Sequence, residues 1–376
     1  MSCKQRKDSR ILKNASWIAK NELNPHADWQ VQIKNSITTA EALSEYLDIN
    51  QSALEKTIRK YPMRITPYYL SLILEHGMPL FRQAVPDTKE LLDHSHTEDP
   101  FREIPFSPVP NLIHRYPDRV VLLVTNACAT YCRHCMRKRM VGYTNPKPLD
   151  MAVAFPMEKA VQYIQEHPAV SDVILSGGDP LLIETRQMAT LIKKINVIDH
   201  VNTIRIHTRI PATLPQRITD NLIDALTADK PIYMNIHFNH PLEITDDARK
   251  ACKKLADAGI PLGSQTVLLK GVNDSRYTLK QLFKDLLAIR VKPYYLHHPD
   301  PVKGTGHFRP SVKKGLKIMK ALRGHISGMS LPHYMIDLPG GGGKVPLVPD
   351  YIKSIGDNHL IVENYKGDVF LYPDGQ

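Results

Sequence analysis

The chain has 376 residues, and its 42% hydrophobic content is that of a globular protein with one large domain and additions, or with two domains. No apolar run approaches the roughly 18 residues of a membrane span, and residues 1–8 are polar, unlike the core of a signal sequence. Five cysteines, three of them crowded between positions 128 and 135, do not form a disulfide framework. We therefore expect a cytoplasmic protein with no membrane partner.

The net charge of +11 is strongly basic. Such a charge can attract nucleic acid or an acidic protein partner. The sequence has no RNA-recognition signature, only 7% aromatic residues, and basic residues spread along the whole chain. The preferred interpretation is an enzyme with a solvated basic surface, and an RNA-modifying iron–sulfur protein is the distant alternative.

The first part of the chain, residues 1–110, has helical and irregular patterns. Residues 39–47 and 50–58 place apolar side chains at helical spacing behind a polar first residue. Residues 95–111 are polar and rich in proline. This part is predicted to wrap around, or link to, a separate core.

From residue 119 onward, short β-branched runs alternate with amphipathic segments. Six strand–helix units favour a parallel sheet that closes, or nearly closes, into a barrel. In such barrels, ligands bind at the carboxyl ends of the strands. The predicted strands are residues 119–125, 172–176, 203–207, 232–237, 262–269 and 292–297, and the predicted helices are residues 185–195, 214–226, 245–258 and 277–289.

Cys128, Cys132 and Cys135 follow the first of these strands directly, so three thiols belong to one loop at the carboxyl end of the barrel. Thiolates are soft ligands that suit iron–sulfur clusters or zinc, and both usually take four protein ligands. A four-iron cluster held by only three thiols would therefore leave one iron open to a small molecule. The alternatives are simple packing of the cysteines, or a zinc site that His134 completes. Four flanking cations are expected to lower the thiol pKa values; they are Arg133, Arg137, Lys138 and Arg139.

The tail contains a second chemical site, in which four glycines at positions 340–343 precede Lys344. Glycines permit positive φ angles and a close approach of the backbone to a ligand. The segment is not a P-loop, because Val345 stands where that motif has serine or threonine. A lysine on a glycine hairpin can reach into a barrel mouth and form a Schiff base with an aldehyde. A flexible turn with a solvated lysine is the alternative.

The cysteine triad together with the glycine–lysine hairpin resembles the lysine 2,3-aminomutase family. Its members are radical S-adenosylmethionine (SAM) enzymes that also use pyridoxal 5′-phosphate (PLP). The resemblance implies an α/β fold: a partial (β/α)6 radical-SAM barrel over residues 111–310, an N-terminal helical extension over residues 1–110 and a C-terminal PLP-binding segment over residues 311–376. Further matching segments are residues 28–32, 65–70, 114–119, 175–180, 237–241 and 271–274.

The resemblance also implies a role for each site residue. The three cysteines would ligate a four-iron four-sulfur (4Fe-4S) cluster whose open iron binds SAM, and Lys344 would hold PLP. Arg137 matches the residue that grips the substrate carboxylate through its guanidinium fork. The cofactor phosphate would be held by Arg115 and Arg119, and the SAM pocket would be lined by Gly177, Gly178, Asp179, His237 and Gln265.

Two carboxylates, Asp300 and Asp337, match positions where lysine-specific members of the family hold the side-chain ammonium of the substrate. Two buried anions around one cation are favourable, whereas two without a cation cost heavily. The resemblance therefore implies an isomerase that moves the α-amino group of L-lysine to the β-carbon and gives β-lysine. Arginine or ornithine as the substrate, and a turn-capping role for Asp300, remain alternatives.

The sequence departs from the family at one metal site. Some members bind structural zinc through C-terminal cysteines and a further cysteine from a neighbouring subunit. Residues 370–376 contain no cysteine, and Ser275 stands at the position of the further one. We therefore predict no zinc, although a homo-oligomer is still expected.

A branch of the family isomerises lysine before its attachment to a translation elongation factor, and residues 297–308 are also similar to that branch. It usually lacks the four-glycine hairpin, so it is the second choice. A regulator without turnover is disfavoured, because the triad and Lys344 are intact. The expected partners are a small amino acid substrate and a one-electron reductant of the flavodoxin or ferredoxin type.

Overall fold

A curved nine-stranded sheet forms the centre of the computed structural model, which describes residues 24–143, 156–356 and 359–373. The polar N-terminus and the last three residues, both used above, lie outside these ranges. The strands are β1 Leu112–Tyr116, β2 Arg119–Thr125, β3 Asp172–Gly177, β4 Thr203–Thr208, β5 Ile232–Ile236, β6 Leu262–Val267, β7 Val291–His297, β8 His333–Leu338 and β9 Gly343–Pro346. They are paired in chain order.

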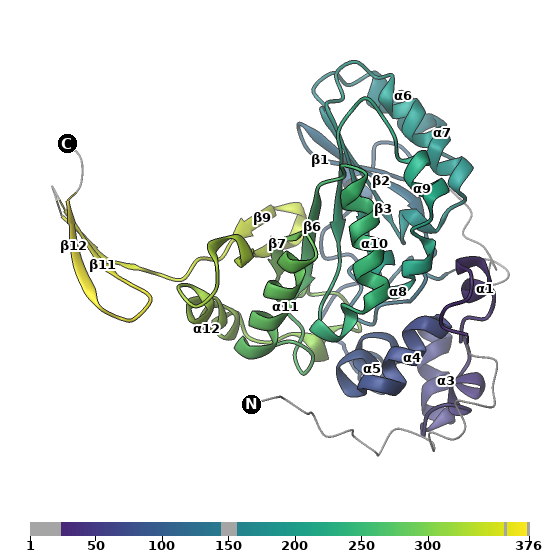
Figure 1. Ribbon diagram of the computed structural model, residues 1–376, viewed down its shortest axis with the longest axis horizontal. Helices are drawn as coiled ribbons and strands as arrows, with labels where there is room; N and C mark the ends of the chain where they lie inside the picture. Colours follow the sequence, from purple (N-terminus) through teal and green to yellow (C-terminus); the bar gives the residue numbers. More distant parts are fainter. Residues whose placement is uncertain (1–23, 144–155, 357–358, 374–376) are drawn as a thin grey trace.

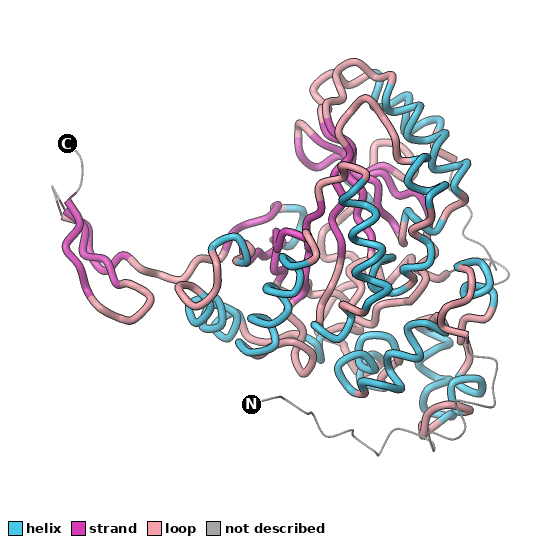
Figure 2. The backbone as a smooth tube through the Cα atoms, in the orientation of Figure 1, coloured by secondary structure: helices cyan, strands magenta, loops and turns pink. Residues whose placement is uncertain are grey.

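Strands β2 to β8 are parallel, and β1 and β9 are antiparallel partners at the two edges. The predicted partial barrel is confirmed: its six strands are present, and β8 adds a seventh parallel strand that the sequence analysis missed. Figures 1 and 2 show the helices on the outside of this sheet. They are α6 Glu158–Gln165, α7 Thr185–Asn196, α8 Ile210–Thr213, α9 Asp220–Ala225, α10 Asp246–Asp257, α11 Arg276–Ala288 and α12 Val312–Leu322.

The helix predicted over residues 214–226 is wrong in its first half. Pro215 begins a separate 3-10 turn, and the shorter helix α9 begins only after Thr219, whose hydroxyl accepts a hydrogen bond from the backbone of Leu222. A proline and a threonine cap within the same apolar pattern therefore divide it into two elements. The other three predicted helices correspond to α7, α10 and α11.

Side chains alternate across the strands, and this alternation separates the core from the site. In β4, Ile204 and Ile206 are fully buried beneath the outer helices, where each stabilises the fold by about 1.5–3 kcal/mol. The intervening Arg205 and His207 line the cavity inside the barrel instead. The same alternation lets one strand supply both the core and the site.

Most of the short helices described in the N-terminal part share a core of their own, while Trp29 and Ile33 of the first helix belong to the core of the barrel. The predicted helices at 39–47 and 50–58 appear as α2 and α3, each capped by the side chain of the residue that precedes it. The division of the chain at residues 110 and 310 stays a prediction. The N-terminal helices are α1 Trp29–Lys34, α2 Ala40–Ser44, α3 Gln51–Lys60, α4 Pro67–His76 and α5 Met78–Ala84.

The C-terminal strands β10 Ile352–Ile355, β11 His359–Glu363 and β12 Val369–Pro373 form a small antiparallel sheet. Figure 1 shows this sheet standing away from the barrel, and β10 and β12 are exposed along their whole length. Within the described ranges, the helices are too short or too polar to cross a bilayer.

Candidate functional site

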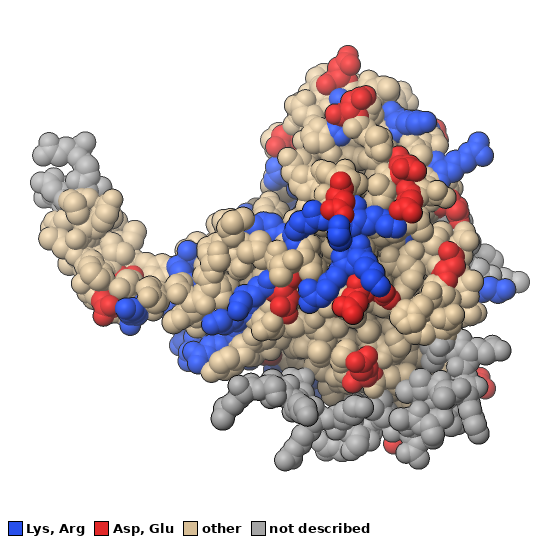
Figure 3. All heavy atoms as spheres, viewed as in Figure 1, with Lys and Arg blue, Asp and Glu red and all other residues tan. Residues whose placement is uncertain are grey.

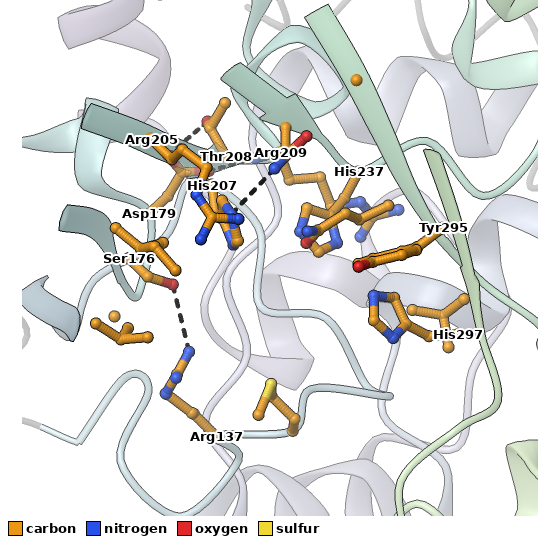
Figure 4. A pocket seen from close by; sticks show the side chains of 18 of the residues that line it. Arg137, Ser176, Asp179, Arg205, His207, Thr208, Arg209, His237, Tyr295 and His297 are labelled. Carbon is orange, nitrogen blue, oxygen red and sulfur yellow. Dashed lines mark hydrogen bonds between the residues drawn. The ribbon is translucent and has the colours of Figure 1, made fainter. Parts of the chain in front are cut away.

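A cavity of about 970 Å³ occupies the barrel interior and extends to the carboxyl ends of the parallel strands. Every residue that the sequence analysis assigned to the site lines this cavity, from Arg115 on β1 to Lys344 on β9. Figure 4 shows side chains from several strands facing this common space. The arrangement brings the predicted residues together, while their individual roles stay predictions.

The loop that carries the three cysteines is held by backbone contacts to the N-terminal helices. Tyr131 N donates to Arg64 O at 3.0 Å, and Arg133 N donates to Gln83 O at 2.9 Å. The glycine loop after β3 lies against the start of the cysteine loop, where a Cβ on Gly178 would come within 2.3 Å of a carbonyl oxygen. The glycine at this position therefore permits close packing of two loops.

A buried carboxylate anchors the middle of the cysteine loop. Glu90 is fully buried and pairs with Arg133 at 2.6 Å and with Lys138 at 2.7 Å. Arg133 also donates to the backbone carbonyls of Pro62 and Tyr61. Because a buried charge is costly unless it is paired, these three residues depend on one another.

The other two cations of the loop pair with Glu103, which lies in the N-terminal part. Arg137 Nη2 is 3.0 Å from one oxygen of Glu103, and Arg139 Nη2 is 2.8 Å from the other. Arg137 also donates to Ser176 Oγ at 3.3 Å (Figure 4). Its Nε is buried without a hydrogen-bond partner among the described residues, so Arg137 retains a donor for a carboxylate.

The expected lowering of the thiol pKa values is wrong for two of the cysteines. Burial raises the pKa of Cys128 well above its ordinary value, and it raises the pKa of Cys135 to about 11. The physical reason is desolvation, which penalises the thiolates more than the nearby cations favour them, and the charges of Asp179 and the neighbouring thiols add to this effect at Cys128. Metal binding would have to displace the protons from these two thiols.

The three thiols suit a cluster better than a single ion. They are free and half-buried, and all of them face the cavity. Across the described ranges, no group of three or more histidine, cysteine or acidic side chains surrounds a point where one metal ion could sit. A four-iron cluster takes each cysteine at a different iron, so its ligands need not meet at one point. His134, the alternative zinc ligand, contacts Asn239 and Phe308.

Lys344 lines the same cavity and belongs to β9, in the hairpin that β8 and β9 form. Its ammonium group pairs with Asp337, which is directly opposite it in the hairpin register. Its backbone N donates to Tyr116 OH at 2.9 Å, so β1 fixes the hairpin. Gly341 has a φ of 89°, and a Cβ there would come within 2.3 Å of the Phe106 ring. Glycine is therefore required at this turn.

Arg115 and Arg119 form a basic wall beside the hairpin. Arg115 lies over the rings of Phe101 and Phe106, and its Nε is buried without a partner among the described residues. Arg119 lies 3.7 Å over the ring of Tyr116. An unsatisfied guanidinium donor beside Lys344 suits the phosphate of PLP, so the residues present fit this cofactor.

Asp300 and Asp337 form the acidic end of the cavity. Burial, followed by the charge of Asp337, raises the pKa of Asp300 to about 7. His297 Nδ1 is 3.8 Å from Asp337, but burial lowers its pKa well below the ordinary value, so it adds no positive charge. Two carboxylates that share a buried space in this way favour a cation between them.

The residues predicted for the SAM pocket line the wall near the cysteines. Asp179 accepts hydrogen bonds from Thr208 Oγ1 and from the backbone N of Arg209, both at 2.7 Å, and burial raises its pKa to about 6. It therefore ties the end of β3 to the end of β4. Gln265 is buried, and burial lowers the pKa of His237 to about 4.

The sequence analysis missed four residues of the site: Arg209, His207, Glu103 and Tyr116. His207 ends the strand predicted at residues 203–207, and Arg209 follows it closely. Both therefore occupy the carboxyl end of that strand and could have been predicted as site residues. Glu103 and Tyr116 have no local signal, since their roles come from contacts with residues far along the chain.

Comparison with known proteins defines the class and then the family. The radical SAM superfamily profile matches residues 122–282, so the barrel and its cysteine loop are those of a radical SAM enzyme. A second profile, described as Lysine-2,3-aminomutase, matches residues 319–376. The chain belongs to the lysine 2,3-aminomutase family, as its relatives also show, and the predicted isomerase class is confirmed at the level of this family.

Three relatives illustrate this membership. The L-lysine 2,3-aminomutase of Methanococcus maripaludis is 44% identical over 97% of this chain and 86% of its own length. The enzyme of the same name from Acetoanaerobium sticklandii is 46% identical over 92% of this chain and 84% of its own. The glutamate 2,3-aminomutase of Clostridioides difficile is 38% identical over 98% of this chain and 88% of its own. The radical SAM family implies a 4Fe-4S cluster, SAM, a small-molecule substrate and a reductant.

Proposed function

We propose that this chain is a radical SAM and PLP-dependent 2,3-aminomutase that converts L-lysine to β-lysine. The observation that carries the proposal is one cavity that joins three free thiols, a hairpin lysine and a buried pair of carboxylates. A cluster-only enzyme would not need Lys344 beside basic side chains. An enzyme for an acidic substrate would not bury two carboxylates together.

Two different sets of residues would hold the two cofactors. Cys128, Cys132 and Cys135 would hold the cluster, while Lys344 and the basic wall of Arg115 and Arg119 would hold PLP. When bound, the cluster with SAM supplies a carbon radical and PLP supplies a conjugated ring that stabilises the substrate radical. The chain itself would exclude water and hold one substrate C–H bond next to the radical centre. Such positioning lowers the activation barrier, because the reacting atoms are already oriented.

The substrate would be held at both ends. Arg137 has a buried donor for the α-carboxylate, and Asp300 and Asp337 would accept the terminal ammonium. Asp337 already pairs with the Lys344 ammonium, so it is able to hold an alkylammonium group. We infer that a substrate ammonium takes this place when Lys344 is bound to PLP.

The choice between lysine and glutamate is the sharpest test of the proposal, because relatives of both names match the chain. Reconstituted protein is incubated without oxygen with SAM, PLP, a reductant and a panel of lysine, ornithine, arginine and glutamate. Mass-resolved chromatography detects the β-isomers. β-Lysine as the main product supports the proposal, and β-ornithine or β-arginine would favour the alternative basic substrates. β-Glutamate would overturn the assignment of the carboxylate pair.

The elongation-factor branch remains the second choice, and the RNA-modifying protein remains the distant alternative. Figure 3 shows Lys and Arg side chains with Asp and Glu among them on the face that includes α10 and α11. On this face, Lys253 and Arg290 pair with Asp257, and Lys254 pairs with Asp220. Basic residues that are paired in this way support a solvated surface rather than a phosphate-binding one. RNA binding that falls steeply with salt would favour the alternative.

A further inference from the structure

Arg209 lies beyond the end of β4 and is buried between the cysteine loop and the N-terminal helices. Its Nη1 donates to Cys132 Sγ at 2.7 Å. Its Nη2 donates to Gln83 Oε1 at 2.7 Å and to Glu243, which is fully buried. The guanidinium group therefore joins a predicted cluster ligand to a fixed carboxylate.

The surroundings hold Arg209 in one orientation. Glu243 Oε2 accepts from the backbone N of Asn239 at 2.6 Å, and Glu243 Oε1 accepts from Tyr69 OH at 2.8 Å. The backbone N of Arg209 donates to Asp179. Both terminal nitrogens of the Arg209 guanidinium group and both oxygens of Glu243 therefore have partners, and Arg209 Nε is buried without one among the described residues. Because the guanidinium group is planar, partners at both terminal nitrogens fix its orientation and hold Nη1 against Cys132.

We propose that Arg209 is a positioning residue that holds Cys132 Sγ and raises the electron affinity of the cluster. The inference rests on the proposed cluster at the three cysteines. Hydrogen bonds to the sulfur ligands and the net charge around a cluster set its reduction potential. A buried guanidinium group provides both, because it donates N–H to the thiolate sulfur and brings a positive charge that stabilises the added electron.

Glu243 allows a test of the inference, because its removal is expected to shift the reduction potential of the cluster in the opposite direction to removal of Arg209. It brings a negative charge to the far side of the guanidinium group and thereby offsets part of its effect. Loss of the Arg209 charge disfavours the reduced cluster, whereas loss of the Glu243 charge favours it. If the two residues had a purely structural role, removing either charge would disorder the site, and the reduced fraction of the cluster would not shift in opposite directions.

The experiment compares the reconstituted, full-length protein with R209Q, R209K and E243Q. Iron and sulfide analysis and visible absorbance establish that the cluster is present, and electron paramagnetic resonance at fixed potentials gives the reduced fraction. In R209Q the ratio of reduced to oxidised cluster falls about tenfold, which for one electron is a shift of about 59 mV. R209K keeps the charge and stays closer to the wild type, and E243Q shifts in the opposite direction.

Arg217 provides the matched control, because it is also buried but, among the described residues, its hydrogen bonds go to the backbone carbonyls of Leu181 and Ile183 and it does not line the cavity. R217Q leaves the reduced fraction unchanged. An R209Q cluster with the wild-type reduced fraction overturns the inference, and so does loss of the cluster in both R209Q and R209K. Loss of the cluster in R209Q alone supports the need for the charge. Wild-type protein that binds no iron would instead refute the proposed cluster itself.

Discussion

The buried carboxylate Asp300 makes a quantitative prediction about stability. Its pKa is raised to about 7 by burial and by Asp337, whereas an aspartate in an unfolded chain titrates near about 3.9. Between pH 6 and pH 8, Asp300 therefore loses its proton in the folded chain, whereas in the unfolded chain it has already lost that proton at lower pH. The sign follows: the free energy of unfolding falls as the pH rises through 7, by about 1 kcal/mol over this range from Asp300 alone.

Asp300→Asn removes this titration and keeps nearly the same shape. Protein without cofactors is unfolded by urea at pH 6, 7 and 8. Between pH 6 and pH 8 the free energy of unfolding of the variant is expected to rise relative to that of the wild type by about 1 kcal/mol. Asp257→Asn, at an exposed aspartate that pairs with Lys253 and Arg290, is the control without such a gain. If the free energy of unfolding has the same pH dependence in Asp300→Asn and in the wild type, the raised pKa of Asp300 is refuted.

The remaining predictions concern the cofactors, the substrate and the N-terminal part. Cys132→Ala is expected to lose the bound iron, the brown absorbance and all turnover, and retained turnover would contradict the radical SAM mechanism. Lys344→Ala should lose the visible absorption of lysine-linked PLP when PLP is added. Asp337→Asn should reduce lysine turnover far more than PLP binding, and equal losses would mean that its role is misassigned. Glu90→Gln leaves two buried cations short of a counter-charge and should cost about 3–5 kcal/mol in urea unfolding; an unchanged midpoint would show that the pairing is weak.

The barrel could be predicted because its strands carry a local signal. The run over β2 and the runs over β3 to β7 are bounded by turn residues, and the predicted ends differ from the observed ones by at most two residues. Strands β8 and β9 were missed because the glycines and Lys344 indicated a hairpin at the barrel mouth, while no strand was assigned to the two arms of that hairpin. Their pairing depends on β7, which lies far earlier in the chain.

The positions of the site residues could also be predicted, because parallel strands bring their carboxyl ends to one edge. What the sequence could not supply was the partner of each charge. The cations beside the cysteines predicted thiols of low pKa, yet burial raises the pKa values of Cys128 and Cys135, and the cations themselves pair with Glu90 and Glu103 of the N-terminal part. Contacts of such long sequence separation leave no periodic pattern to read.

The contact between Arg137 and Glu103 constrains how the substrate carboxylate can bind. Both terminal nitrogens of Arg137 are in use, one with Glu103 and one with Ser176, and the buried Nε alone lacks a partner among the described residues. A carboxylate that binds in a bidentate manner needs two of these three nitrogens. In the role proposed for it, Arg137 would therefore share or exchange a hydrogen bond when the substrate carboxylate binds. Since Glu103 also pairs with Arg139, it would keep a second cation to hold it in place after that exchange, and the N-terminal part would then contribute directly to substrate binding.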